Sequence, residues 1–289
     1  MTNTKNNIIA FQGELGANGD LACRAVRSDM QTLPCHTFED TFAAVKEGKA
    51  KYLLIPIDNT VAGRVADIHH LLPESGLHII GEHFQRVEHH LLVVKGTQLE
   101  ELTHVHSHVH ALNQCKIAIQ DYGLEPMVHV DTAAAAREIS ERGKSAHAAI
   151  ASELAGEIYG LDSLRANIED ADHNTTRFLL MAQEPIPVLI DDDDLITSFV
   201  FRVRNVSAAL YKALGGFATN GVNMLKLESY LVGGGFVAAQ FYAEVEGHPE
   251  NPSVCMAMEE LEFFTHEVRF LGVYPRNSAR DIINKNSIG

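Results

Sequence analysis

Histidines are the side chains that stand out first as possible carriers of chemistry. Alternate residues of a strand share one face, so four alternating histidines in one segment could bind zinc together. No Cys or carboxylate completes such a site locally. We therefore predict a polar strand face that leads into a helix at Ala111, and no metal. The alternating set and two further pairs are His104, His106, His108, His110, His69-His70 and His89-His90.

Glycines recur at a spacing of three near the start of the chain, at Gly13, Gly16 and Gly19, just after a predicted strand. The spacing differs from the GxGxxG pattern of dinucleotide-binding folds, and the segment lacks the lysine of a phosphate-binding P-loop. We therefore predict no nucleotide cofactor.

Five polar residues stand near predicted strand ends and helix starts, where they could meet an anionic ligand. Asn59 could orient a ligand with its amide or simply form a turn, and Ser107 could donate to a carboxylate or to a helix start. Gln114 follows on that helix. Asp131 could cap a helix that begins at Thr132, where backbone N–H groups suit an anion. From the residues alone, a structural and a binding role remain open for each.

A hydroxyl pair and a cation come together at Thr175, Thr176 and Arg177. In a dry cleft a threonine hydroxyl can donate a hydrogen bond to developing charge on oxygen. The two threonines could equally be β-branched residues that open a strand. Arg177 could offset a carboxylate, or it could brace the turn through Glu169 or Asp170.

Alternating strand and helix patterns must position these side chains. Strands are predicted at 8–12, 52–57, 126–130 and 146–151, with two more within 78–94. Helices are predicted at 64–72, 111–122, 132–142 and from Ser152 to Tyr159, and Thr37 with Asp40 forms a capping-box pair that predicts a helix start before Phe38. Such alternation predicts an α/β domain with mostly parallel sheets over residues 1–182. Ligands of open α/β sheets bind outside the carboxyl ends of the strands.

A second unit follows a linker. Residues 183–197 contain Pro185, Pro187 and the acidic run Asp191–Asp194, which is typical of a solvated linker. Residues 198–277 then show strand, helix, strand, a turn at Gly233–Gly235, strand, helix and strand. This βαββαβ order predicts a ferredoxin-like unit.

Composition excludes several classes of function. A net charge of -15 argues against nucleic acid, whose phosphates need stripes of Lys and Arg. No run approaches the roughly 20 apolar residues of a membrane span. The start of the chain does not have the pattern of a signal peptide, and the four scattered cysteines fit free thiols in a reducing cytosol. We therefore expect a cytoplasmic protein.

Five short segments resemble, in order, those of the prephenate dehydratase family. Each motif is weak alone, but the five in order, followed by a region that resembles the family's C-terminal ACT domain, cover nearly the whole chain. They are Pro56-Ile57-Asp58-Asn59-Thr60, Ser107-His108-Val109-His110-Ala111-Leu112-Asn113-Gln114-Cys115, Asp131-Thr132-Ala133-Ala134, Ala149-Ile150-Ala151-Ser152 and Asn174-Thr175-Thr176-Arg177-Phe178.

The resemblance implies a fold with two α/β lobes, similar to periplasmic binding proteins, with the active site in the cleft between them. It implies a lyase that converts prephenate to phenylpyruvate with no cofactor or metal. In the family, the threonine of this last motif acts at the step in which the hydroxyl group of the substrate departs. The matching residue in this chain is Thr176. Implied catalytic residues are Thr176, Asn59, Ser107, Gln114 and Asp131, and implied substrate-binding residues are Thr60, Thr132, Arg177, Phe178, Gly16 and Ala17.

The resemblance also implies regulation by an amino acid. Paired ACT domains would hold L-phenylalanine as an allosteric effector and join the chain into a homo-oligomer, a dimer or a tetramer. The matching positions are Ala208, Ala209, Leu210, Asn223, Glu228 and Ser229.

The chain departs from the family pattern in three places. The first loop, Gly13–Gly19, lacks two hydroxyls, which leaves backbone N–H groups to meet a substrate carboxylate. A Pro-Gln pair is replaced by Val109-His110, and the motifs of the ACT domain are altered. Two rival functions remain: arogenate dehydratase, which shares the motifs, and a non-catalytic protein that binds a small anion in the cleft.

Overall fold

The chain divides into two compact units, each built from segments distant in sequence. The computed structural model describes residues 7–65, 68–190, 192, 194–204, 206–231 and 238–287, with the backbone alone at 238, 239 and 284–287. The first unit comprises residues 1–65 and 83–178, and the second comprises residues 66–82 and 179–289.

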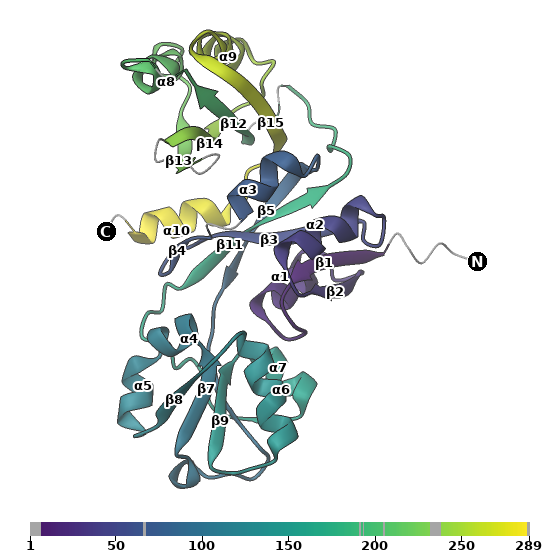
Figure 1. The fold of residues 1–289 in the computed structure, drawn as a ribbon, viewed down its shortest axis with the longest axis vertical. Coiled ribbons are helices and arrows are strands. Elements are labelled where there is room, and N and C mark those ends of the chain that lie inside the picture. Colours follow the sequence, from purple (N-terminus) through teal and green to yellow (C-terminus); the bar gives the residue numbers. More distant parts are fainter. Residues whose placement is uncertain are drawn as a thin grey trace, which may run out of the picture. The chain divides into compact units, whose positions relative to one another are not determined.

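The first sheet forms one lobe of the first unit and has the strand order β2-β1-β3-β11-β5, with β4 paired to β3 (Figure 1). β1 pairs in parallel with both β2 and β3, and the buried side chains of Ile9 and Leu53 lie on these strands. Thr37 Oγ1 accepts from the Asp40 N–H at 3.1 Å, which confirms the predicted helix start. The elements are β1 (Ile8–Gln12), α1 (Asn18–Val26), β2 (Gln31–Cys35), α2 (Phe38–Lys46), β3 (Tyr52–Asn59), β4 (Gly63–Arg64), β5 (His78–Arg86) and β11 (Thr175–Ala182).

The second sheet forms the other lobe and has the order β10-β6-β9-β7-β8. β7 is parallel to β8 and β9, whereas β6 is antiparallel to both of its neighbours, β9 and β10, so the expectation of mostly parallel strands holds for only part of this sheet. Helices α4 and α5 lie on one face, and α6 and α7 on the other (Figure 1). The elements are β6 (His90–Val93), η2 (Leu99–Glu101), β7 (His104–His108), α4 (Val109–Gln114), α5 (Lys116–Asp121), β8 (Glu125–His129), α6 (Thr132–Arg142), β9 (His147–Ala151), α7 (Glu153–Tyr159) and β10 (Asp162–Arg165).

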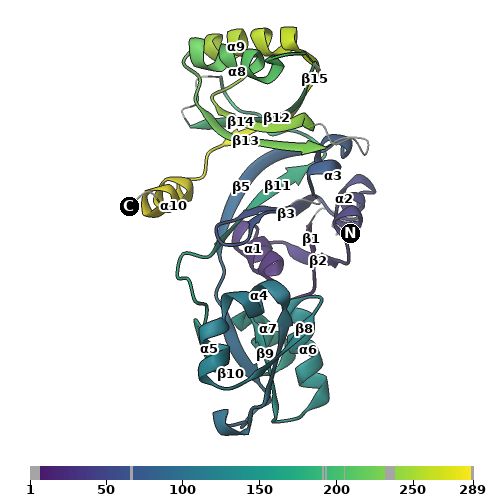
Figure 2. The same cartoon turned by 60° about the vertical axis from the view of Figure 1, so that its left-hand side comes forward.

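The second unit contains an antiparallel four-stranded sheet of order β13-β14-β12-β15. Helices α8 and α9 cover one of its faces (Figure 2). The chain order βαββαβ and this strand order make the unit ferredoxin-like, as predicted. The elements are β12 (Leu195–Val203), α8 (Ala209–Thr219), β13 (Met224–Leu231), β14 (Ala238–Glu246), α9 (Pro252–Phe264) and β15 (Thr265–Pro275).

Two further helices belong to the second unit, and the sequence patterns misplaced one and missed the other. Helix α3 (Ile68–Glu74) begins later than predicted, and α10 (Ala279–Ser287) lies beyond the expected end at residue 277. Arg280 on α10 joins the buried carboxylates of Glu82 and Glu244, at 2.6 and 3.1 Å. The guanidinium offsets the charge of the two buried carboxylates, and their burial is stable only while the three groups stay in contact.

The predicted linker is shorter than expected, because β12 already begins at Leu195, so residues 195–197 belong to the strand. The acidic run is described only at Asp192 and Asp194, and the predicted turn at Gly233–Gly235 lies outside the described residues.

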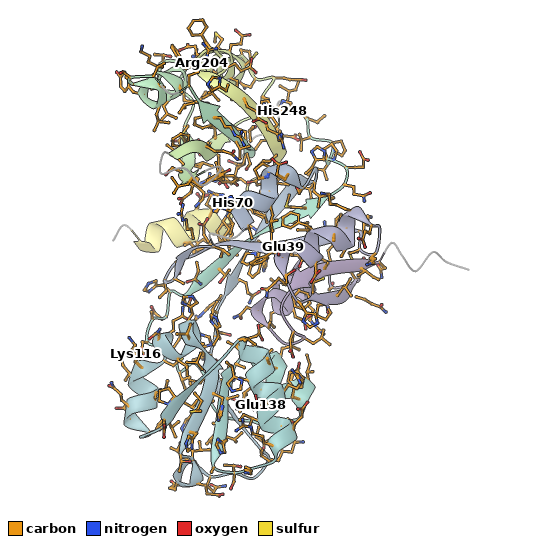
Figure 3. The ribbon with its side chains drawn as sticks, viewed as in Figure 1. Glu39, His70, Lys116, Glu138, Arg204 and His248 are labelled. Atoms are coloured by element: carbon orange, nitrogen blue, oxygen red, sulfur yellow. The ribbon has the colours of Figure 1, made fainter. Side chains whose placement is uncertain are left out.

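Three histidines form a hydrogen-bonded row across β8, β7 and β9. The two ring nitrogens of buried His106 each lie 2.9 Å from another ring, that of His129 on one side and that of His147 on the other. His129 Nδ1 then lies 3.2 Å from the carboxylate of Glu138 on α6, which lies on the opposite face of the sheet from Lys116 (Figure 3).

The predicted common face of the four alternating histidines is wrong, because β7 ends at His108, which caps α4, and His110 lies inside that helix. The nitrogens of His106 face different rings, so the row does not converge on one point. Within the described part of the chain, no group of three or more His, Cys, Asp or Glu side chains is arranged to hold a metal ion.

The histidine row makes stability depend on pH. Burial and the neighbouring His129, Arg142 and His147 lower the pKa of His106 from 6.5 to about 4, with Glu138 opposing. The unfolded chain therefore takes up this proton near pH 6.5, while the folded chain takes it up only near pH 4. The free energy of unfolding should fall across that interval as the pH drops.

We expect His106→Gln to flatten this fall, while His36→Gln, at an exposed position, should leave it unchanged. Urea unfolding of the three proteins between about pH 4 and pH 8 measures the effect. An equal slope in the wild type and in His106→Gln would contradict the assignment.

Candidate functional site

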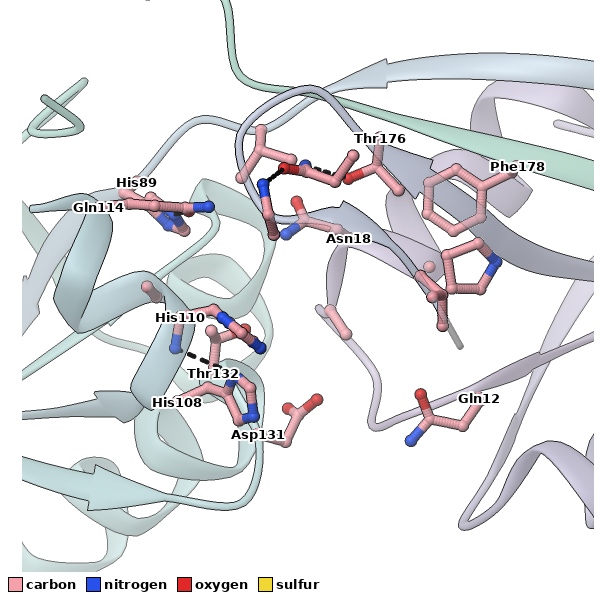
Figure 4. A pocket seen from close by; sticks show the side chains of 18 of the residues that line it. Gln12, Asn18, His89, His108, His110, Gln114, Asp131, Thr132, Thr176 and Phe178 are labelled. Atoms are coloured by element: carbon pink, nitrogen blue, oxygen red, sulfur yellow. Dashed lines mark hydrogen bonds between the residues drawn. The ribbon is translucent and has the colours of Figure 1, made fainter. Parts of the chain in front are cut away.

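A pocket of about 340 Å³ lies between the two lobes of the first unit. Its walls come from the loop before α1, the β3–β4 turn, the start of α4, the start of α6 and the start of β11. Figure 4 shows His108, His110, Asp131 and Thr132 along one wall, with Thr176 and Phe178 along the other. The lining residues are Gln12, Ala17, Asn18, Gly19, Leu54, Pro56, Asn59, Ala62, Val65, Val87, His89, His108, His110, Ala111, Gln114, Val130, Asp131, Thr132, Thr176 and Phe178.

Seven of the eleven residues that the sequence predicted for the active site line this pocket, although they come from segments more than 150 residues apart. They are Ala17, Asn59, Gln114, Asp131, Thr132, Thr176 and Phe178.

Two of the other four predicted residues are buried with partners of their own. The hydroxyl of Ser107 is fully buried and donates to the backbone carbonyl of Ile150 at 2.6 Å, which ties β7 to β9. The guanidinium of Arg177 lies 3.7 Å from the carboxylate of Asp58, whose side chain is mostly buried. Neither side chain lines the pocket, so each shapes it from behind.

The remaining two predicted residues hold the loops around the pocket. Thr60 Oγ1 donates to the carbonyl of His173 at 2.8 Å and accepts from the N–H of Thr175 at 2.9 Å. Gly16 has φ +87°, and a Cβ there would lie 2.7 Å from the Cα of Ala155. Only glycine fits that approach of the first loop to α7.

Asn59 controls the hydroxyl of Thr176 through hydrogen bonds of fixed direction. Asn59 Oδ1 accepts from the backbone N–H groups of Val61 and Ala62, at 2.9 and 2.7 Å. A backbone N–H can only donate, so the Asn59 NH₂ group must point the other way. It donates to Thr176 Oγ1 at 2.9 Å and to Asn174 Oδ1 at 2.8 Å. Since Thr176 Oγ1 accepts this bond, its own hydrogen remains available to donate into the pocket.

The same chain of amides continues to the other lobe. The Nδ2 atom of Asn174 donates to Gln114 Oε1 at 2.9 Å, and that oxygen lies 3.0 Å from His89 Nε2. Sequence reasoning assigned no role to Asn174 or to His89. Asn174 belongs to a motif and His89 to a pair of histidines, but nothing local in the sequence connects residues 25 to 115 positions apart.

Asp131 caps helix α6 and borders the pocket. Its Oδ1 accepts from the N–H groups of Ala133 and Ala134, at 2.7 and 3.1 Å, which is the capping role expected from the sequence. Burial raises the pKa of this carboxyl, and the two N–H donors oppose the rise. Thr132 follows at the first position of the helix and also lines the pocket.

Among the described residues, no Lys or Arg lines the pocket. The basic groups there are His89, His108 and His110. Burial lowers the pKa of His89 and of His108, so both are neutral near pH 7. His108 Nδ1 accepts from the N–H of His110 at 3.3 Å, which places a hydrogen on its Nε2. An anion in this pocket would therefore meet neutral donors and the N-terminal ends of α1 and α6.

The predicted effector positions lie in the second unit. Ala208 has φ +61° and precedes α8, whose first residues Ala209 and Leu210 belong to the set. Asn223 follows the other end of that 11-residue helix, and Glu228 and Ser229 lie on the edge strand β13. An 11-residue helix spans about 16 Å, so its two ends could not contact one amino acid within a single copy.

Within the described part of the chain, no helix is long and apolar enough to span a membrane. All four cysteines are free, as the sequence predicted.

Comparisons with known proteins agree with this geometry. The family model described as prephenate dehydratase matches residues 9–186. A curated relative from Komagataeibacter europaeus, named bifunctional N-acyl-homoserine lactone acylase/prephenate dehydratase, is 50% identical over 94% of this chain and 97% of its own. Arogenate dehydratase/prephenate dehydratase 1 of Arabidopsis thaliana is 35% identical over 94% of this chain and 73% of its own.

Solved structures add two neighbours. One, described as GqqA, a novel type of quorum quenching acylase, has a TM-score of 0.89 and 50% identity, covering 94% of this chain and 99% of its own. Prephenate dehydratase from Arthrobacter aurescens in complex with L-Phe has a TM-score of 0.85 and 25% identity, covering 98% and 100%. This chain belongs to the prephenate dehydratase family.

Proposed function

We propose that this protein converts prephenate to phenylpyruvate. The observation that carries the proposal is the hydrogen bond from Asn59 Nδ2 to Thr176 Oγ1, which leaves the Thr176 O–H to donate into a pocket of about 340 Å³. A donor of fixed direction at the wall of a pocket suits a reaction in which a hydroxyl must leave.

The two carboxylates of prephenate need partners in a pocket whose described lining holds no Lys or Arg. The uncapped N-terminus of α1, at Asn18 and Gly19, offers backbone N–H groups to one carboxylate. Because Asp131 already occupies the N–H groups of Ala133 and Ala134, the hydroxyl of Thr132 and the amide of Gln114 serve the other. This distribution replaces the hydroxyls that the first loop lacks with main-chain donors.

The chemical step redistributes electrons within the substrate. The bond to the ring carboxylate breaks and its electron pair enters the ring, CO₂ departs, and the bond from C4 to the hydroxyl breaks. The departing hydroxide takes up a proton and leaves as water, and the ring becomes aromatic. Thr176 donates a hydrogen bond to the departing oxygen, where negative charge develops. A positioned donor of this kind contributes roughly 10²–10⁴-fold to the rate.

The ferredoxin-like unit is, in this proposal, an ACT domain that binds L-phenylalanine. Support comes from its strand order and from the relative from Arthrobacter aurescens, solved in complex with L-Phe. The positions at the two ends of α8 and on the edge strand β13 would meet a ligand only when two copies pair. The protein would therefore act as a dimer or tetramer, in the cytosol, where free cysteines persist.

Two alternative substrates deserve direct comparison. Arogenate carries an amino group where prephenate has a keto oxygen, and a relative named for both activities is 35% identical to this chain. Relative rates on the two compounds decide which is preferred.

N-acyl-homoserine lactones are a second candidate, because the relative with 50% identity is named as an acylase as well as a dehydratase. No Ser or Cys is among the described residues that line the pocket, so amide hydrolysis there would use water or a threonine hydroxyl. His108, kept neutral by its lowered pKa, is the candidate base. Release of a free amine from N-hexanoyl-homoserine lactone, lost in His108→Gln, would support this second activity.

Thr176→Val removes the hydroxyl at nearly constant volume. We expect kcat on prephenate to fall about 10²–10⁴-fold while binding changes little, because the lost bond is made mainly as charge develops. Thr175→Val is the matched control at the adjacent position and should retain activity. Steady-state kinetics with both variants measures the effect, and an unchanged kcat in Thr176→Val would remove the threonine from the mechanism.

L-Phenylalanine should bind the full-length protein and lower its turnover of prephenate, because a coupling free energy of about 1–3 kcal/mol is typical between regulatory and active sites. Titration calorimetry and inhibition kinetics measure the two effects. The absence of both heat and inhibition would show that this unit is not a phenylalanine sensor.

A further inference from the structure

Gln114 is held so that one end of its amide is fully occupied and the other is not. Its Oε1 receives Asn174 Nδ2 at 2.9 Å and His89 Nε2 at 3.0 Å, while Nε2 has no hydrogen-bond partner among the described residues. Oε1 and its two neighbours are mostly buried, whereas Gln114 also lines the pocket. The unoccupied NH₂ end is therefore the part of Gln114 that a ligand can reach.

The direction of the Asn174 amide follows from a constraint outside it. Asn59 can offer Asn174 only an N–H, since its own oxygen accepts from the Val61 and Ala62 N–H groups. Asn174 must therefore turn Oδ1 toward Asn59 and Nδ2 toward Gln114. Asn174 is 1% exposed, so no solvent rearrangement can satisfy the opposite orientation cheaply.

We propose that Asn174 is a positioning residue that makes Gln114 present its NH₂ group, and not its oxygen, to a carboxylate of the substrate. This inference rests on the proposed function for the identity of the anion. The reversed Gln114 amide would set its NH₂ against the N–H of Asn174, leaving buried donors without an acceptor, and would force His89 into its other tautomer. It would also turn an oxygen toward the anion. Through Asn174, the hydrogen-bond directions fixed at the β3–β4 turn also determine the orientation of the Gln114 amide in the opposite lobe.

The arrangement requires one tautomer of His89. Its Nε2 must carry the hydrogen to donate to Gln114 Oε1, and burial, the main cause of its lowered pKa, keeps the ring neutral. If Gln114 were reversed, Nε2 of His89 would have to accept and the hydrogen would move to Nδ1. The tautomer of His89 therefore reports the direction of the Gln114 amide without any need for substrate.

Asn174→Asp tests the proposal, because a carboxyl group imitates asparagine only when it is protonated. The protonated acid accepts from Asn59 and donates to Gln114, as the amide does. The carboxylate accepts from Asn59 but cannot donate, so Gln114 must turn its NH₂ inward and its oxygen toward the substrate. The bond from Asn59 to Thr176 is kept in both forms, so binding should suffer more than the chemical step.

We expect the KM of Asn174→Asp for prephenate to exceed that of the wild type about 10- to 100-fold near pH 8, with kcat changed far less. The ratio to the wild type should recover toward pH 5, since burial raises the pKa of a carboxyl at this site. Asn113→Asp adds the same charge at the exposed neighbouring position on α4 and should show no such recovery. Gln114→Glu, which places an oxygen toward the pocket directly, should reproduce the rise in KM.

Nitrogen-15 NMR of the histidines in the full chain supplies the second measurement, with His89 assigned through His89→Gln. The wild type should show the Nε2–H tautomer, and Asn174→Asp near pH 8 the Nδ1–H tautomer. An Nδ1–H tautomer in the wild type, or a variant that loses kcat equally at every pH, would overturn the proposal. Because the NMR result needs no turnover, inactivity of the wild type on prephenate would count against the proposed function alone.

Discussion

Two backbone N–H groups, those of Val61 and Ala62, fix the direction of the hydrogen bonds that run from Asn59 through Asn174 to Gln114. They occupy Asn59 Oδ1, which forces the Asn59 NH₂ group toward Thr176 and Asn174. A backbone N–H cannot exchange the roles of donor and acceptor, whereas hydroxyls, amides and imidazoles can. The turn between β3 and β4 therefore determines which groups of the amide network donate and which accept. A buried network of this kind is specific only when every member has a hydrogen-bond partner.

Contacts between segments that are distant in the sequence hold that turn and the other loops around the pocket in place. Thr60 holds the segment at His173 and Thr175, and Ser107 joins the neighbouring strands β7 and β9. Gly16 brings the first loop against α7, where any side chain would collide. Each of these residues was predicted for the active site, and the structure places each behind the pocket lining. Among the described residues, the polar part of the lining consists of amides, imidazoles, threonine hydroxyls and the Asp131 carboxylate, with no Lys or Arg.

Local features of the sequence predicted the local features of the structure. The caps at Thr37 and Asp131 and the βαββαβ order of the second unit depend on residues close in the chain. The antiparallel direction of β6 could not be predicted in this way, because strand direction depends on pairing across the sheet. The contacts of α10 with β5 and with the ferredoxin-like sheet have the same cause, since Arg280 meets Glu82 across 198 positions and Glu244 across 36.

In the candidate site, too, local features could be predicted from the sequence and long-range contacts could not. The short motifs identified Thr176, Asn59 and Gln114, whose hydroxyl and amide groups indicate their hydrogen-bonding roles from the sequence alone. Asn174 and His89 have ordinary local surroundings, and only their contacts with residues 25 to 115 positions away reveal what they do. Ser107 carries a family motif, but its hydroxyl is directed at a carbonyl in a neighbouring strand. A motif therefore identified the region of the pocket more reliably than the side chains that line it.

The most direct test of the central claim is the formation of phenylpyruvate from prephenate by the purified wild-type protein, with no added metal or cofactor. The ultraviolet absorbance of phenylpyruvate in alkali follows the product, and the uncatalysed reaction is measured in parallel. The account predicts turnover of about 1 s⁻¹ or faster, within the ordinary range for enzymes. Formation of phenylpyruvate at the uncatalysed rate by a folded protein would contradict it.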